Sequence, residues 1–187
     1  AFVGTEARLD FFKLYGDDRS AHNREGTAKP PNSARRVFLD SCLNSQTLPL
    51  PLLIAREAAA TKQLDLNHYK MDDQLAANFA AAIPQLLAQG VHIEVLLLRH
   101  NPIGAKGCIA IAGALGSCLH LQRLDLSGCD LSDNRDSQLH PTTVLGEALK
   151  NHPTIEAVAL AKTRLSDRAA TGLLVNFEAH RTLNELD

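Results

Sequence analysis

The sequence has no tryptophan, two tyrosines, six phenylalanines and one methionine among its 187 residues. Aromatic residues make up only 4% of the chain, although hydrophobic residues reach 45%. The core must therefore be built mainly from leucine and alanine, which suits the narrow interior of a stack of short repeated units. No apolar run is long enough for a membrane span. The formal net charge of −2 gives no basic surface for nucleic acid.

Motifs that would indicate catalysis are also missing. The sequence contains neither a phosphate-cradling G-x-x-x-x-G-K-[ST] motif nor a G-x-S-x-G elbow. Six of its eight histidines fall in three pairs at matching positions, without the cysteines or carboxylates that a metal site needs. Asp65 and Asp125 occupy equivalent positions, but Leu97 interrupts the row. We therefore expect no enzyme activity, no cofactor and no metal.

Leucine-rich segments recur along the chain with a fixed internal spacing. In "LLLRHNPI" an asparagine follows the last leucine by three residues, and "LDLNHYKM", "LDLSGCDL" and "VALAKTRL" keep the same offsets. The segment "VFLDSCLN" is a weaker copy. Separations of 27 to 34 residues between copies indicate a solenoid. The residues in the asparagine slot are Cys42, Tyr69, Asn101, Cys129 and Thr163.

Each copy divides into a short strand and a helix. Leu96 and Leu98 alternate with Leu97 and Arg99, as inward and outward residues of a strand do. The following segment, "GAKGCIAIAGALGSCL", has the apolar spacing of a helix. These patterns predict a curved α/β solenoid with a parallel sheet on the concave face and helices on the convex face. The asparagine slot is predicted to form a structural ladder that satisfies buried backbone groups at each turn.

The pattern LxxLxLxx(N/C)xL followed by a helix resembles the leucine-rich repeat family, ribonuclease-inhibitor-like subtype, over residues 36–187. The resemblance implies a non-enzymatic protein-interaction scaffold. A branch of the subtype activates a small GTPase, so a GTPase regulator is an alternative, and a structural subunit of a large assembly is another. Two cysteines in repeat slots and no N-x-[ST] sequon favour a reducing, cytoplasmic location.

The predicted organisation has two parts. Residues 1–35 are expected to form a capping helix and a linker, and residues 36–187 about five repeats, of which the first is degenerate. A further repeat begins at the C-terminus, so more repeats or a partner are expected to cover that edge. A polar insert at 132–143 is expected to be an exposed loop.

The predicted binding surface is the outward side of the strands. Val95 and Leu97 are apolar residues flanked by Arg99 and Arg123, which predicts a protein partner with an acidic segment and apolar anchors. The insert and the C-terminal edge remain alternative binding sites, and the partner itself is not identified. The candidate contact residues are Arg36, Phe38, Asp65, Val95, Leu97, Arg99, Arg123 and Asp125.

Overall fold

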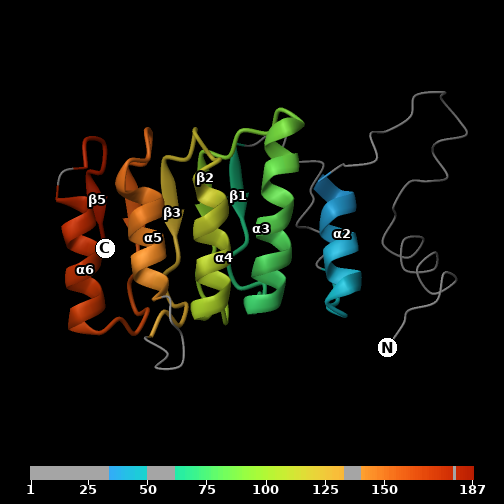
Figure 1. Ribbon diagram of the computed structural model, residues 1–187, viewed down its shortest axis with the longest axis horizontal. Helices are drawn as coiled ribbons and strands as arrows, with labels where there is room; N and C mark the ends of the chain where they lie inside the picture. The colour runs from blue at the N-terminus through green and yellow to red at the C-terminus, as the bar shows by residue number, and fades with distance from the viewer. Residues whose placement is uncertain (1–33, 50–61, 133–139, 179) are drawn as a thin grey trace, which may run out of the picture.

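The structure is a computed structural model that describes residues 34–49, 62–132, 140–178 and 180–187. Within these ranges, strands and helices alternate along the chain (Figure 1). The elements in order are α2 (Ala34–Asn44), β1 (Gln63–Asp65), α3 (Asp73–Ala88), β2 (Val95–Leu97), α4 (Ala105–Leu115), β3 (Arg123–Asp125), α5 (Pro141–Lys150), β4 (Ala157–Ala159), α6 (Asp167–Phe177) and β5 (Glu185–Leu186).

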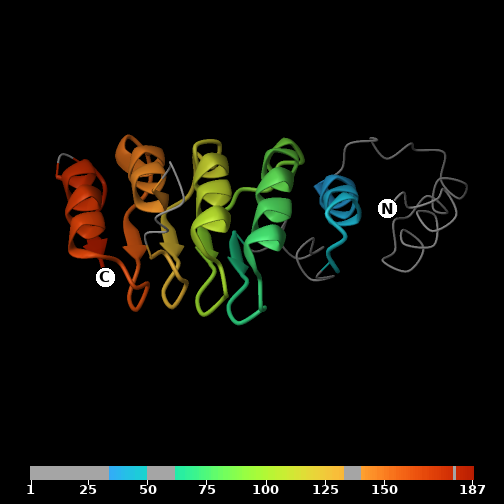
Figure 2. The same ribbon diagram turned by 60° about the horizontal axis from the view of Figure 1, so that its bottom comes forward.

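The strands form one parallel sheet in the order β1-β2-β3-β4-β5. Its register aligns equivalent repeat positions, so that Leu64, Leu96 and Leu124 are direct neighbours on adjacent strands. The helices stand side by side along one face of this sheet (Figures 1 and 2). The predicted α/β solenoid, with strands on the concave face and helices on the convex face, is confirmed.

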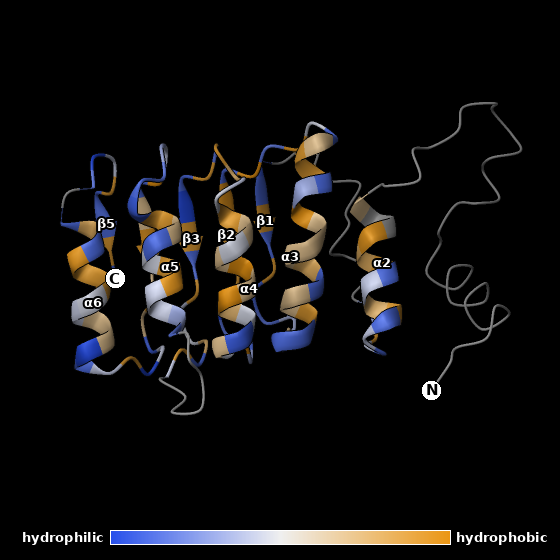
Figure 3. Ribbon diagram, in the orientation of Figure 1, coloured by the Kyte–Doolittle hydropathy of each residue, from blue (hydrophilic) through white to orange (hydrophobic). Residues whose placement is uncertain are grey.

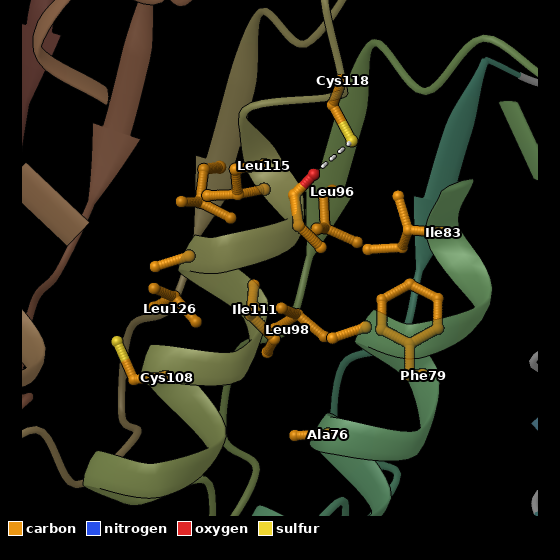
Figure 4. Packing of buried hydrophobic residues seen from close by; sticks show 14 of the residues in the cluster. Ala76, Phe79, Ile83, Leu96, Leu98, Cys108, Ile111, Leu115, Cys118 and Leu126 are labelled. Carbon is orange, nitrogen blue, oxygen red and sulfur yellow. Dashed lines mark hydrogen bonds between the residues drawn. The ribbon is translucent and has the colours of Figure 1, made fainter. Parts of the chain in front are cut away.

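The core lies between the sheet and the row of helices. Leu96 and Leu98 point inward from β2 and the turn after it, and both are fully buried. They lie among Phe79 of α3 and Ile111 and Leu115 of α4 (Figure 4). Each fully buried side chain of this size contributes roughly 1.5–3 kcal/mol. Equivalent layers repeat along the solenoid, which is why leucine and alanine suffice without tryptophan.

The prediction of a first strand around residues 36–40 is wrong. Arg36, Phe38 and Cys42 lie in the helix α2, so neither Arg36 nor Phe38 belongs to the concave face. The physical reason is a stripe at four-residue spacing: Ala34, Phe38 and Cys42 are 0–1% exposed. This stripe forms the buried side of the helix. Cys42 is therefore a core residue rather than a member of the turn ladder.

The α2–α3 contact also contains a buried polar group. Asn78 of α3 is 2% exposed, and its amide donates to Ser45 Oγ at 2.9 Å and to Cys42 Sγ at 3.4 Å. Its carbonyl oxygen accepts from Ser41 Oγ at 2.7 Å. These bonds fix α2 beside α3, in the same row as the other helices (Figure 2).

Two predicted segments fall largely outside the described residues. The capping helix and linker at 1–35 are outside apart from the start of α2, and residues 133–139 of the insert are outside as well. Within the predicted insert 132–143, the structure shows that α5 already begins at Pro141, so the end of that range is helical. Proline suits the first helical position because no backbone donor is needed there.

Candidate protein-binding surface

The outward side chains of the strands form rows across the sheet. One row consists of Gln63, Val95, Arg123, Ala157 and Glu185, because the register places them on neighbouring strands. The next row consists of Asp65, Leu97, Asp125 and Ala159. We call this side of the sheet the concave face. Its rows put side chains from distant parts of the sequence about 4.8 Å apart.

The β2 positions of this face are apolar. Val95 and Leu97 are both partly exposed, and Arg99, two residues beyond Leu97, is exposed. The outward residues of β1 and β3 are polar or charged, and both strands carry hydrophilic stretches in Figure 3, whereas β2 consists of a valine and two leucines. The structure therefore places Val95, Leu97 and Arg99 together, as the alternation predicted.

The other half of the concave face is closed over by its own side chains. Arg123 Nη1 lies 3.3 Å from Glu185 Oε2, which pairs β3 with β5 across the small Ala157 of β4. Ala157 and Asp125 are each only 9% exposed. Asp125 Oδ1 accepts a hydrogen bond from the backbone N–H of Ser127 at 2.9 Å. Arg123 is therefore held in an ion pair with its side chain 41% exposed, and Asp125 is buried, whereas Asp65 is exposed.

A polar depression of about 820 Å³ lies at the carboxyl ends of β1 and β2. A chain of hydrogen bonds connects three of its lining residues. Asn67 N–H donates to Asp65 Oδ1 at 3.0 Å, and Arg99 N–H donates to Asn67 Oδ1 at 2.7 Å. Arg99 Nε donates to His100 Nε2 at 3.2 Å. We call this depression the Arg99 pocket. Its lining residues are Asp65, Asn67, His68, Tyr69, Arg99 and His100.

Two stacked histidines form one side of the Arg99 pocket. The rings of His68 and His100 are stacked with centroids 4.8 Å apart, and both residues have positive φ, at 60° and 56°. We call each strand with its following turn and helix a rung of the solenoid. The equivalent residue on the next rung is Gly128, with φ of 75°. A Cβ there would lie 2.4 Å from His100 Nδ1, so the glycine leaves room for the ring. In the described part of the chain, no three His, Cys, Asp or Glu side chains are grouped to hold a metal.

The predicted ladder residues make different numbers of bonds. Asn101 is 2% exposed; its amide donates to the carbonyls of Leu66 and Leu98 at 2.8 and 2.7 Å, and its oxygen accepts from Met71 N–H at 3.0 Å. The backbone of the first rung is thereby tied to the second, at the residue that follows His100 of the Arg99 pocket.

The other slots make weaker or different contacts. Cys129 Sγ donates to the Leu98 carbonyl at 3.5 Å, and Thr163 Oγ1 donates to Leu160 within its own rung at 2.6 Å. Tyr69 packs against the core and lines the Arg99 pocket.

Sequence reasoning missed a carboxylate that crosses between rungs. Asp73, at the start of α3, accepts from the backbone N–H groups of Gly104 and Gly107 at 2.6 and 2.9 Å. It therefore caps the N-terminus of α4, whose own N-cap, Gly104, has no side chain to do so. A Cβ on Gly107 would lie 2.7 Å from Asp73 Oδ1. The closely spaced glycines were the available signal.

The buried titratable groups are poor candidates for chemistry. All four cysteines are buried free thiols. Burial raises the pKa of Cys42, Cys118 and Cys129 to about 11 and that of Cys108 to about 12. Their thiolate forms are therefore scarce, which disfavours a nucleophilic role. His152 is 4% exposed, and burial is the main cause that lowers its pKa.

A comparison with protein families supports the repeat interpretation. The family model described as "Leucine Rich repeat" matches residues 91–112 and 117–134, two successive repeats that include β2 and β3. These matches and the parallel solenoid support a leucine-rich repeat protein. A comparison with curated proteins found no match to the chain. No helix among the described residues has the length and apolar character needed to cross a membrane.

Proposed function

We propose that this chain is a non-enzymatic protein-interaction module of the ribonuclease-inhibitor-like subtype, and that it binds a protein partner through the β1–β2 half of the concave face. Leucine-rich repeats suggest protein–protein interaction in general. The proposed contact centre is formed by Val95, Leu97 and Arg99, with Asp65 at its edge.

The observation that carries this proposal is the apolar outward side of β2. Val95 and Leu97 stay partly exposed, while the alanines at the same positions of β4 are buried. Covering such apolar surface is worth roughly 25 cal/mol per Å². An apolar centre beside an arginine is also the composition typical of interface cores.

The C-terminal edge is proposed to be covered as well, by further repeats or by a partner. Leu186 is 39% exposed, although Leu64, Leu96 and Leu124 at the same position of other strands are 0–6% exposed. On α6, Leu174 is 53% exposed. These exposed apolar residues support the proposal that this edge is covered.

We further propose a reducing compartment such as the cytoplasm, which the four free thiols support. For a GTPase regulator or a structural subunit, the described residues offer no specific feature, so neither is proposed.

The test is a charge-reversing double variant, Leu97→Asp with Arg99→Glu. Neither side chain enters the core, so the variant should keep the wild-type circular dichroism spectrum and melting temperature. Partners captured by the wild-type protein and quantified by mass spectrometry should be lost from the variant. Leu119→Asp, at a residue that is 57% exposed in the turn after α4, is the matched control and should retain them. Equal capture by the double variant would exclude this half of the concave face.

A further inference from the structure

The cations near the concave face differ in whether they have a carboxylate partner. Lys62 pairs with Glu94 at 2.5 Å, Arg123 with Glu185 at 3.3 Å, and Arg164 with Asp130 at 2.9 Å. Within the described ranges, Arg99 has no carboxylate at ion-pair distance. An exposed arginine without an internal partner, in a pocket with ordered walls, suits recognition of an external anion.

The hydrogen bonds of Arg99 define which part of its guanidinium remains available. Its backbone N–H is held by Asn67, and its Nε donates to His100 Nε2. His100 is itself stacked on His68, with Gly128 leaving room for the ring. The Asn67 bond fixes the backbone of Arg99 and the His100 bond orients its guanidinium, so its two terminal nitrogens remain as a pair of donors. Such a fork matches the two oxygens of a carboxylate.

The charge of the opposite wall limits the kind of anion. Asp65 lines the same pocket, and its Oδ1 is occupied by the Asn67 N–H. A negative group that enters the pocket must tolerate this carboxylate, which disfavours a doubly charged phosphate more than a singly charged carboxylate. The apolar Leu97, which the register places beside Asp65, is available for a neighbouring apolar side chain.

We infer that the Arg99 pocket is a carboxylate subsite, which receives one Asp or Glu side chain of the partner while an adjacent apolar side chain of the partner covers Leu97. This inference rests on the proposed function and narrows it. Arg123 does not contribute, because Glu185 already neutralises it. The acidic segment expected from the sequence is thereby reduced to a single carboxylate at a defined place.

A displayed library of random twelve-residue peptides provides a probe that needs no known partner. Selection on the wild-type protein should enrich peptides in which Asp or Glu lies next to an apolar residue. Arg99→Gln should weaken the selected peptides by roughly tenfold or more, as loss of a charged hydrogen-bond pair predicts. The matched control Arg123→Gln should leave their affinity within about twofold, since that arginine is already paired.

Substitution within a selected peptide distinguishes a carboxylate from a phosphate as the bound group. Replacing its Asp or Glu by the amide should reproduce the loss caused by Arg99→Gln, and replacing it by phosphoserine should weaken binding because of Asp65. Tighter binding of the phosphoserine peptide would overturn the assignment to a carboxylate.

The remaining outcomes separate this inference from the proposed function. Peptides that lose binding with Leu97→Asp but carry no acidic residue would overturn the carboxylate subsite and leave the concave-face proposal standing. Failure to enrich any peptide sensitive to Leu97→Asp or Arg99→Gln would overturn the subsite and remove support from the binding surface as well.

Discussion

The two halves of the concave face are built on the same repeat but differ in whether their outward side chains are available to a partner. The β1–β2 half is open, and the β3–β5 half is closed by its own side chains. On the β1–β2 half, Leu97 is partly exposed and Arg99 lacks a carboxylate among the described residues. On the β3–β5 half, the ion pair of Arg123 with Glu185 spans the buried Ala157. The inward residues of β1 to β4 are apolar and buried in both halves, so the fold does not dictate the difference. It depends on the outward residues: the small Ala157 lets Arg123 of β3 reach Glu185 of β5, whereas β2 has the larger Val95 in the same row.

The halves also differ in how their turns are held together. Beneath the open half, Asn101 makes three hydrogen bonds and joins two rungs. In the closed half, Thr163 donates to a carbonyl of its own rung. The binding surface that we propose therefore stands on the more strongly cross-linked part of the ladder, which favours a preformed site.

The largest effect on stability is expected from Asn101→Ala. It should lower the free energy of unfolding by about 1–3 kcal/mol, because it leaves buried backbone groups without partners. Thr163→Val, the control in the closed half, should cost only about 0.5–1.5 kcal/mol, since one bond is lost. Urea unfolding of both variants measures the difference. Equal losses would mean that the two halves are held equally well.

The next effect concerns the cap between rungs. Asp73→Ala should destabilise the protein by about 1 kcal/mol, because two backbone donors at the start of α4 lose their acceptor. Asp167→Ala, in the first turn of α6, is the control and should cost less, since Ser166 supplies the cap there. Thermal unfolding of the two variants decides between these expectations, and a larger loss for Asp167→Ala would contradict them.

Acid should destabilise the closed half first. Burial lowers the pKa of His152 in the folded protein, so the unfolded chain binds its proton at a higher pH. The contribution of neutral His152 is thus fully present above about pH 6.5 and is lost as the pH falls below it. Hydrogen exchange at pH 7 and pH 5 should show loss of protection near α5 before β1 and β2. His152→Leu should reduce this pH dependence, and an unchanged dependence would assign it to other groups.

The smallest effect is expected from the surface ion pair. Arg123→Gln should change stability by less than about 1 kcal/mol, because both side chains are well exposed to solvent. It should expose Ala157 without creating a binding surface. Urea unfolding of this variant measures the stability change, and partner capture tests whether a new binding surface appears. A gain of new partners would show that the ion pair masks a second site.

The strands and the sheet register could be predicted because the two-residue alternation within each strand agrees with the spacing between repeats. Alternation of Leu96 with Leu97 gives the faces of a strand, and the repeat length aligns Leu96 with Leu124. The ion pair of Arg123 with Glu185 was implicit in the same register, since both fall in one row with Ala157, although only the folded geometry shows that the side chains meet.

The helix α2 and the Arg99 pocket could not be predicted from the pattern of leucines. Val37 and Leu39 fit a strand, but Phe38 and Cys42 also fit a helix, and burial of the helical stripe decided the outcome. The Arg99 pocket was not predicted, because it arises from backbone turns at His68 and His100 with positive φ. Such turns are rare for residues other than glycine, so the pattern of leucines gave no sign of them.

Coverage of the β1–β2 half of the concave face by a partner can be detected by crosslinking. A photo-crosslinking amino acid placed at Leu97 tests it most directly, with the same group at Glu185 and at Leu174 for comparison. All three positions are solvent-accessible and lie on the open half, the closed half and α6. Covalent adducts with the partner are expected from position 97, and none are expected from position 185. Adducts from 185 or 174 without any from 97 would contradict it.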